Sequence, residues 1–280
     1  MMLTTTHLDA FLAVSRNLNF TKAAAELHVT QSALSQRILN LEKELGTTLF
    51  IRDRGGIKLT ETANELVRYC RIKNQLEEEF LNSLKNKTAE KLAGVLRIGA
   101  FSSVMSSLVL PAFAPFFKDN SSVSFHAFNR EMSHLPDMLK RGEIDYMLLD
   151  HKLDWEDLEQ VHLFDESYVL TEKKNYDGPD IYLDHDEQDT TTFKYLRFAG
   201  VKQKNIKRQY LDEIHGIIEA VKLGVGRAVL PLHLVKQEKN LQILSPQTVL
   251  KVPVYLSFYS QPYYSKLHQS VLKYFQSIHP

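Results

Sequence analysis

The spacing of apolar and polar positions divides the chain into three zones. Residues 5 to about 60 have the periodicity of short amphipathic helices, followed by two β-prone runs. Residues 60 to about 90 are mostly polar, with apolar positions three and four residues apart that predict one long helix. From about residue 94 onward, apolar runs alternate with amphipathic segments, as is typical of an α/β domain. The polar stretch 85–91 is predicted to be a hinge.

The first zone contains two short segments that predict a helix-turn-helix. In residues 19–27, three alanines favour helix and let another helix approach closely. Residues 31–45 form the second helix, because Thr30 can cap its start and Gly46 can end it. Four apolar positions of this helix form one stripe that is expected to be buried: Leu34, Ile38, Leu41 and Leu45.

The N-terminal end of that second helix carries small polar side chains away from the apolar stripe. A helix of this kind can enter the major groove of DNA, where Gln pairs with adenine and Ser contacts several bases. The polar positions at this end are Gln31, Ser32, Ser35, Gln36 and Arg37. The pattern also fits a small helical subdomain whose polar residues are merely solvated.

A hairpin is predicted next, because residues 48–60 place two β-prone runs on either side of a Gly-Gly pair. Its tip carries Arg52, Arg54 and Lys58, which suit phosphate contact or insertion into the minor groove. Lys and Arg outnumber Asp and Glu by three between residues 16 and 60, although the whole chain has a net charge of +0. The hairpin therefore favours the DNA-binding interpretation.

The long helix is expected to begin after Thr60, which can cap it, and to reach about residue 88. An apolar stripe interrupted by Lys73 predicts a coiled-coil-like partner. Packing of the helix on its own domain is the alternative. Cys70 lies on this helix and is expected to be inert core. The stripe consists of Leu66, Tyr69, Leu76 and Phe80.

The third zone begins with a strand at 94–100, followed by a helix that starts at Ser102 and Ser103. The free N–H groups of such a turn can bind an anion, or the serines can simply cap the helix. Further strands are predicted at 146–149 and 168–170. A helix at 214–221, a glycine turn and a strand at 228–231 come next, and the last helix covers 265–278.

Residues 11–66 resemble the signature of LysR-type transcriptional regulators, and the resemblance extends to the C-terminus. The segments that carry it are Asn19–Phe20 with the alanine run, Thr30–Ser35, Leu41–Glu42, Leu45–Gly46, Leu49–Phe50 with Arg52 and Arg54, and Thr60–Glu61. The resemblance implies DNA contacts from Thr30, Gln31, Ser32, Ser35, Gln36, Arg37, Arg52 and Arg54. Gln36 departs from the family, in which many members carry arginine there.

The resemblance also implies the fold: α/β overall, with an all-α winged helix-turn-helix, a linker helix and a two-lobed, periplasmic-binding-protein-like (type 2) sensor. The domains are expected at 5–60 (DNA binding), 61–90 (linker and dimerisation) and 94–280 (effector binding). Lobe I would hold 94–160 and 255–280, and lobe II 161–254. Effector contacts are expected from Ser102, Ser103, Phe128, Asp150, Thr190 and His215.

These features predict a bacterial, cytoplasmic regulator that binds operator DNA under the control of a small-molecule effector. The expected macromolecular partners are double-stranded DNA and further copies of the chain, which would form a homodimer or homotetramer through residues 61–90 and the sensor. RNA polymerase is a further expected partner if the protein is a transcriptional activator. Residues 183–196 faintly resemble the subgroup that senses basic amino acids. Their acidic residues suit a cationic ligand or, as the favoured alternative, form a solvated loop: Asp184, Asp186, Glu187 and Asp189.

Other function classes receive less support. The sequence shows no phosphate-binding loop, zinc-protease motif, nucleophile elbow or Rossmann fingerprint, so no catalytic residue, metal or cofactor is expected. A solute-binding protein is disfavoured because no signal peptide is recognisable and the N-terminal zone has the pattern of a DNA-binding domain. No membrane span is expected, because no apolar run approaches about 18 residues. A DNA-binding architectural protein that responds to no ligand remains an alternative.

Overall fold

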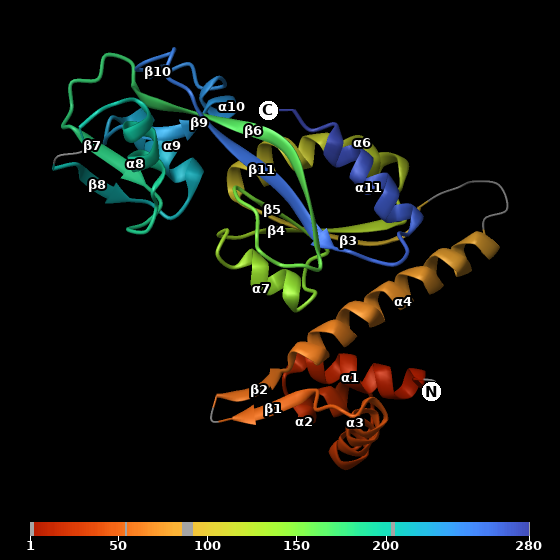
Figure 1. Ribbon diagram of the computed structural model, residues 1–280. Helices are drawn as coiled ribbons and strands as arrows, with labels where there is room; N and C mark the ends of the chain where they lie inside the picture. The colour runs from red at the N-terminus through yellow and green to blue at the C-terminus, as the bar shows by residue number, and fades with distance from the viewer. Residues whose placement is uncertain (1–2, 54, 86–91, 203–204, 280) are drawn as a thin grey trace. The chain divides into compact units, whose positions relative to one another are not determined.

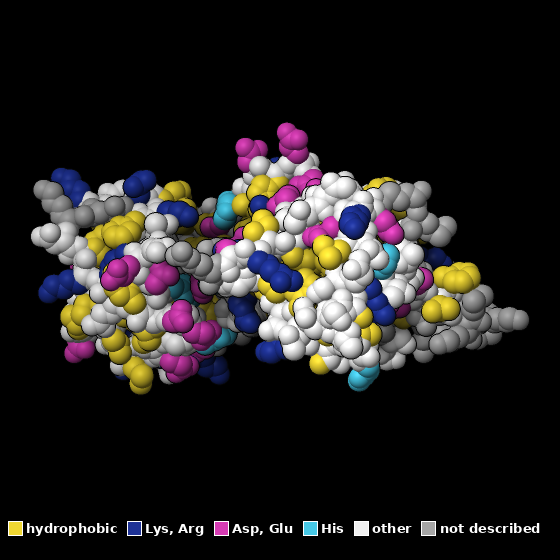
Figure 2. All heavy atoms as spheres, turned by 90° about the horizontal axis from the view of Figure 1, so that it is seen from below, with side chains coloured by type: hydrophobic (Ala, Val, Ile, Leu, Met, Phe, Trp, Pro, Cys, Tyr) yellow, Lys and Arg dark blue, Asp and Glu magenta, His cyan; other side chains and the backbone are white. Residues whose placement is uncertain are grey.

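The computed structural model describes residues 3–53, 55–85, 92–202 and 205–279, which form two compact units (Figure 1). The first unit holds residues 1–95 together with 137–143, and the second holds 96–136 and 144–280. Basic and acidic side chains are intermixed over the face shown in Figure 2, in line with the net charge of +0. No single sign of charge dominates this face.

The first unit begins with three helices, a hairpin and a long helix, as predicted. Thr30 accepts a hydrogen bond from the Ala33 N–H (3.2 Å), and Gly46 ends the helix with φ +67°. Thr60 caps the long helix by accepting from the Ala63 N–H (3.1 Å). The elements are α1 (Thr5–Asn17), α2 (Phe20–Glu26), α3 (Gln31–Leu45), β1 (Phe50–Asp53), β2 (Gly56–Leu59) and α4 (Glu61–Lys85).

The core of this unit lies where the helices meet the hairpin. Leu34, Ile38 and Leu41 of α3 are buried, as their spacing predicts, whereas Leu45 at the end of the same stripe is only partly buried. The Phe50 ring packs against Phe11 and Phe20, with ring centroids 5.6 and 5.9 Å apart. Because α3 buries this stripe, its polar N-terminal end is left facing outward. Cys70 is also buried, which raises the pKa of its thiol to about 11 and keeps it protonated, as expected of core packing.

The second unit alternates strands and helices. Its elements are β3 (Gly94–Ala100), α5 (Ser102–Val104), a π-helical turn (Met105–Val109), α6 (Leu110–Asp119), β4 (Val123–Asn129), β5 (Tyr146–Leu149), β6 (Leu158–Lys173), β7 (Ile181–Asp184), α8 (Thr191–Phe198), β8 (Lys207–Tyr210), α9 (Ile214–Leu223), β9 (Ala228–Pro231), α10 (Leu232–Val235), β10 (Leu241–Ile243), β11 (Leu250–Tyr259) and α11 (Lys266–Gln276). A further helix, α7 (Leu135–Lys140), follows β4 in the chain, and most of it is grouped with the first unit. The π-helical turn interrupts the predicted helix and ends two residues before Pro111, which has no N–H to continue the α-helical ladder.

Two long antiparallel strands, β6 and β11, connect the two halves of the second unit (Figure 1). The main sheet has the order β10-β6-β11-β5-β3-β4, with β9 also paired to β6, while β7 and β8 form a separate parallel pair. We call the half with β3, β4 and β5 lobe I, and the half with β7, β8 and β9 lobe II. The predicted strand at 168–170 was too short, because β6 covers 16 residues. Charged residues along β6, such as Glu159 and Asp165, obscure its alternating pattern in the sequence.

Among the described helices, none is both long and apolar enough to cross a lipid bilayer.

Candidate functional site

The N-terminal end of α3 presents polar side chains to solvent. Thr30, Gln31, Ser32 and Gln36 are exposed, whereas Ser35 and Arg37 are half-buried. The Gln31 amide donates to the Ser35 hydroxyl (3.1 Å) and the Gln36 amide donates to Asn40 (2.9 Å). These intrahelical bonds hold both glutamine side chains along the helix surface.

The hairpin presents Arg52 from β1. Its guanidinium lies over the Phe20 ring, 4.5 Å from the centroid, and the side chain is exposed. Lys58 pairs with Asp53 (2.7 Å) across the hairpin, so part of the predicted positive charge is neutralised internally. Arg54, the other arginine predicted at the tip, lies outside the described residues. The structure thus leaves the Arg52 side chain exposed on the hairpin.

A cavity of about 510 Å³ opens in the second unit, within the size range of small-molecule sites. Lobe I contributes the turn after β3 and the segment 129–134, and lobe II contributes β7, the loop before α8 and the start of α9. Six carboxylate side chains are among the described residues that line it: Glu131, Asp184, Asp186, Asp189, Asp212 and Glu213. Arg130 is the sole lysine or arginine among those residues, so the lining is acidic.

A buried carboxylate supports two side chains of the cavity wall. Glu166 on β6 is 1% exposed and accepts hydrogen bonds from the hydroxyls of Ser103 (3.2 Å) and Tyr168 (2.7 Å). Its burial raises the pKa of this carboxyl to about 7, although both hydrogen bonds act to lower it. Glu166 therefore fixes the direction of Ser103 and Tyr168, both of which line the cavity.

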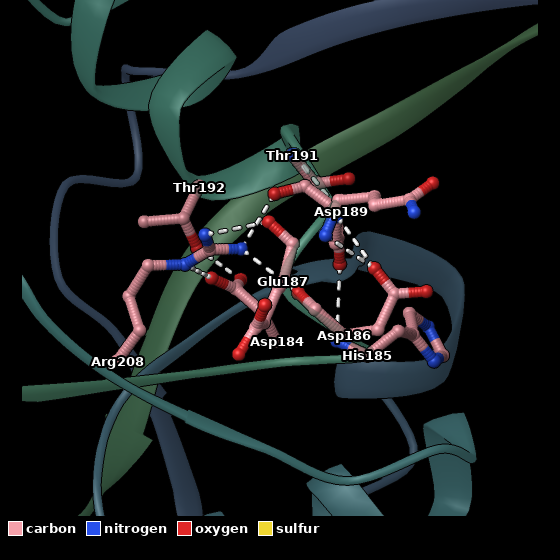
Figure 3. A network of polar contacts seen from close by, with 9 residues as sticks. Asp184, His185, Asp186, Glu187, Asp189, Thr191, Thr192 and Arg208 are labelled. Atoms are coloured by element: carbon pink, nitrogen blue, oxygen red, sulfur yellow. Dashed lines mark hydrogen bonds and ion pairs between the residues drawn. The ribbon is translucent and has the colours of Figure 1, made fainter.

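The acidic segment before α8 folds around an arginine (Figure 3). Arg208 of β8 forms an ion pair with Asp184, and its guanidinium also donates to the backbone carbonyls of Asp189 (2.5 Å) and Asp186 (3.2 Å). The hydroxyl of Thr192 donates to the same Asp184 carboxylate (2.5 Å). Asp184 is 3% exposed, and its ion pair with Arg208 compensates for its burial. The interpretation of this segment as a solvated loop was therefore wrong for Asp184.

Asp189 has a different role in the same segment. Its carboxylate accepts from the backbone N–H groups of Thr191 (2.8 Å) and His185 (3.1 Å). Burial alone would raise the pKa of Asp189, but these hydrogen bonds outweigh it and hold the pKa below its usual value. Asp189 is therefore ionised at neutral pH and adds to the negative charge at the cavity.

Of the six residues predicted to contact an effector, Ser102 and Ser103 line the cavity. The other four lie outside its lining: Phe128, Asp150, Thr190 and His215. Phe128, Thr190 and His215 lie one or two residues from lining positions, whereas Asp150 follows β5 and pairs with His151 (2.6 Å) and Lys194 (3.9 Å). The lining residues that sequence reasoning missed include Asn129, Tyr168, Asp212 and Glu213.

Comparison with known families decides what these two units are. The helix-turn-helix model described as "Bacterial regulatory helix-turn-helix protein, lysR family" matches residues 5–64, and the "LysR substrate binding domain" matches residues 89–278. The chain belongs to the LysR family of transcriptional regulators. It is thus a DNA-binding regulator with an effector-binding domain, and the predicted family and function are confirmed. Members of this family are regulators rather than enzymes.

Individual relatives support the same assignment. The chain is 30% identical over 251 residues to the regulator YofA of Bacillus velezensis, covering 83% of this chain and 82% of that protein. It is 29% identical over 242 residues to the carbapenem-hydrolyzing beta-lactamase transcriptional activator of Enterobacter cloacae, covering 83% and 80%.

Solved structures show that the fold is shared along the whole chain. ArgP from Mycobacterium tuberculosis matches with a TM-score of 0.81 at 20% identity, covering 99% of this chain and 97% of that one. LysG from Corynebacterium glutamicum, solved with bound effector Arg, matches with a TM-score of 0.75 at 20% identity, covering 98% and 97%. The predicted fold class is therefore confirmed.

Proposed function

We propose that this LysR-family regulator responds to a small molecule that carries positive charge, such as a basic amino acid or an amine, bound in the cavity of the second unit. The observation that carries the proposal is the excess of carboxylates in the cavity lining. Six acidic side chains line the cavity, against a single basic one, Arg130. Arg208 neutralises Asp184, which leaves Asp186, Asp189, Asp212 and Glu213 among the carboxylates of lobe II. A concave surface of one sign concentrates small ions of the opposite sign.

The LysG structure provides a first probe, because its bound effector is arginine. A guanidinium offers five N–H donors in a planar fork, which suits recognition by several carboxylates. Ser102 and Ser103 belong to the proposed contact set because both line the cavity. Phe128, Asp150, Thr190 and His215 remain predictions that stand outside its lining.

We propose further that α3 reads the operator. Gln31, Ser32, Ser35 and Gln36 would contact base edges, while Thr30, Arg37 and the wing residues Arg52 and Arg54 would position the protein on the phosphates. The domains are proposed to be 5–60 for DNA binding, 61–90 for the linker helix and 94–280 for effector binding. The protein would act in the cytoplasm, and as an activator it would also contact RNA polymerase.

The proposed assembly is a homodimer or homotetramer, formed through α4 and the sensor. Exposed apolar side chains on α4 support it: Tyr69 is 49% exposed and Phe80 is 61% exposed. A dimer would present two recognition helices to two half-sites about one helical turn apart, or a multiple of it. The effector would then shift the balance between two arrangements of the assembly on DNA.

A thermal-shift screen of the full-length protein tests the effector class. The panel pairs cations with anions of similar size: L-arginine, L-lysine, agmatine and putrescine against L-glutamate and succinate. A ligand present at 100 times its dissociation constant should stabilise the folded protein by about 2.7 kcal/mol. Stabilisation by the cations alone supports the proposal. Stabilisation by the anions, or by none of the panel, contradicts it.

A further inference from the structure

Glu213 connects the two lobes across the cavity. One carboxylate oxygen accepts from the backbone N–H groups of His215 (2.9 Å) and Gly216 (3.1 Å) at the start of α9. The other oxygen accepts from the hydroxyl of Ser102 (3.2 Å) in lobe I, 111 residues earlier in the chain. The Ser102 oxygen in turn accepts from the side-chain amide of Asn129 (3.1 Å). A single carboxylate thus satisfies donors from both lobes.

Those donors have the chemistry of an anion-binding site. Free N–H groups at a helix start and a directed hydroxyl are the groups that bind a carboxylate or phosphate. In this protein they are already satisfied by Glu213. Burial would raise the pKa of Glu213, but the backbone and Ser102 hydrogen bonds lower it, so the side chain is an anion at neutral pH. A second anion placed at these donors would be repelled by the negative charge of Glu213.

We propose that Glu213 takes the place of an effector carboxylate and thereby selects a cation that lacks one, such as a diamine or a guanidinoalkylamine, over the corresponding amino acid. The inference rests on the proposed cationic effector and narrows its class. Glu213 is then a specificity-determining residue. Its charge attracts the cationic group of the ligand, and its side chain occupies the Ser102 hydroxyl and the N–H groups at the start of α9, so a ligand α-carboxylate cannot bind them.

The exposure of Glu213 is consistent with a selective role. Its side chain is 51% exposed, so it faces the space that a ligand enters. Asp212, the preceding residue, also lines the cavity and is exposed. The two acidic side chains therefore add similar charge, whereas Glu213 bonds to Ser102 across the cavity. This pair of neighbours separates the effect of position from the effect of charge.

The test compares two ligands that differ only in a carboxylate, L-arginine and agmatine, by isothermal titration calorimetry with the full-length protein. The wild-type protein should bind agmatine more tightly than L-arginine. Glu213→Gln keeps the size of the side chain and an oxygen that can cap α9, but it removes the charge. The ratio of the two affinities should move toward L-arginine by about tenfold or more, because the repulsion between the Glu213 carboxylate and the ligand's α-carboxylate is removed.

Asp212→Asn is the matched control. It removes the same charge from the same lining, so it should weaken both ligands, and it should shift their ratio less than Glu213→Gln does because Asp212 makes no bond to Ser102. Tighter binding of L-arginine than of agmatine by the wild-type protein overturns this inference. An equal effect of Glu213→Gln and Asp212→Asn on the ratio also overturns it, while the cationic effector stands. If neither ligand binds the wild-type protein, this inference is overturned, while the proposed effector class is decided separately by L-lysine and putrescine in the thermal-shift panel.

Discussion

The hydroxyl of Tyr168 donates a hydrogen bond to the carboxylate of Glu166, with 2.7 Å between the two oxygens. The residues are two positions apart on β6, so they share one face of the strand. Glu166 is buried, while Tyr168 lines the cavity. The His233 imidazole is also close to Glu166, with 3.8 Å between its Nδ1 and the carboxylate. A titratable group is thus built into the support of the cavity wall.

Glu166 should make the protein less stable as the pH rises from about 4.5 to 7. Its pKa is about 7 in the folded protein, because burial disfavours the charged form, against an ordinary value of 4.5. Between these values the folded protein retains a proton that the unfolded chain has released, so a rise in pH favours unfolding. The loss should be on the order of 3 kcal/mol. Urea denaturation at pH 5 and pH 7.5 measures it.

Glu166→Gln isolates this contribution because glutamine carries no proton to release. The burial of His233 lowers the pKa of its imidazole, and that group changes stability in the opposite direction, gaining as the pH rises toward 6.5. The informative quantity is therefore the difference between wild type and variant at each pH. Glu187→Gln, at an exposed position, should follow the wild type. Parallel pH curves for wild type and Glu166→Gln would show that this carboxyl is not perturbed.

Arg208→Met should destabilise the second unit by about 3–5 kcal/mol, because it leaves the buried Asp184 carboxylate without its partner. Adding Asp184→Asn should recover part of the loss, since the orphaned charge is then gone. Arg197→Met, at an exposed position on α8, removes the same kind of side chain and should cost little. Chemical denaturation of the three variants checks the order. Equal losses from Arg208→Met and Arg197→Met would contradict the role given to Arg208.

The sequence predicted those features that depend on neighbouring residues. The bounds of α3 follow from Thr30 and Gly46, which are local capping signals, and the turn at Ser102 follows from the end of an apolar strand. The length of β6 depends instead on pairing with β11, about 90 residues away in the chain. A strand whose partners are distant and whose surface is charged has no strong local pattern.

The candidate cavity shows the same contrast between features set by neighbouring residues and features set by distant contacts. The sequence shows the carboxylates of the segment before α8 as a group, but the ion pair between Asp184 and Arg208 depends on the parallel pairing of β7 and β8. Glu213 could have been noticed as the cap of a predicted helix. Its bond to Ser102 could not, because it arises when segments 111 residues apart come together.

Phe80→Asp should weaken self-association through α4. Phe80 is 61% exposed and lies on the stripe with Leu76 and Tyr69, so a charge there would be buried in a helix–helix interface. Asn74→Asp adds the same charge to an exposed position off the stripe and is the control. Sedimentation velocity over micromolar concentrations should show smaller species for Phe80→Asp alone. An unchanged assembly, or a wild-type monomer, would refute the proposed role of α4.

Gln31→Ala and Arg52→Ala should affect DNA binding in two different ways. Gln31 is exposed at the start of α3, and its amide can leave Ser35 to pair with adenine, so its loss should remove about 1–3 kcal/mol of discrimination at one base pair. Arg52 lies on the hairpin, with its guanidinium over the Phe20 ring of α2, and is proposed to contact phosphates. Its loss should weaken all sequences similarly and reduce the slope of log affinity against log salt by about 1.

Fluorescence anisotropy with an operator selected from genomic DNA, a set of single-base variants and a scrambled duplex separates these outcomes at several salt concentrations. Comparison within one salt series is essential, because affinity for any DNA changes with ionic strength. If Gln31→Ala weakens the scrambled duplex as much as the operator, Gln31 contacts the backbone and the bases are read elsewhere on α3. If Arg52→Ala changes the preferred base, the hairpin enters a groove, and sequence recognition is shared between α3 and the wing.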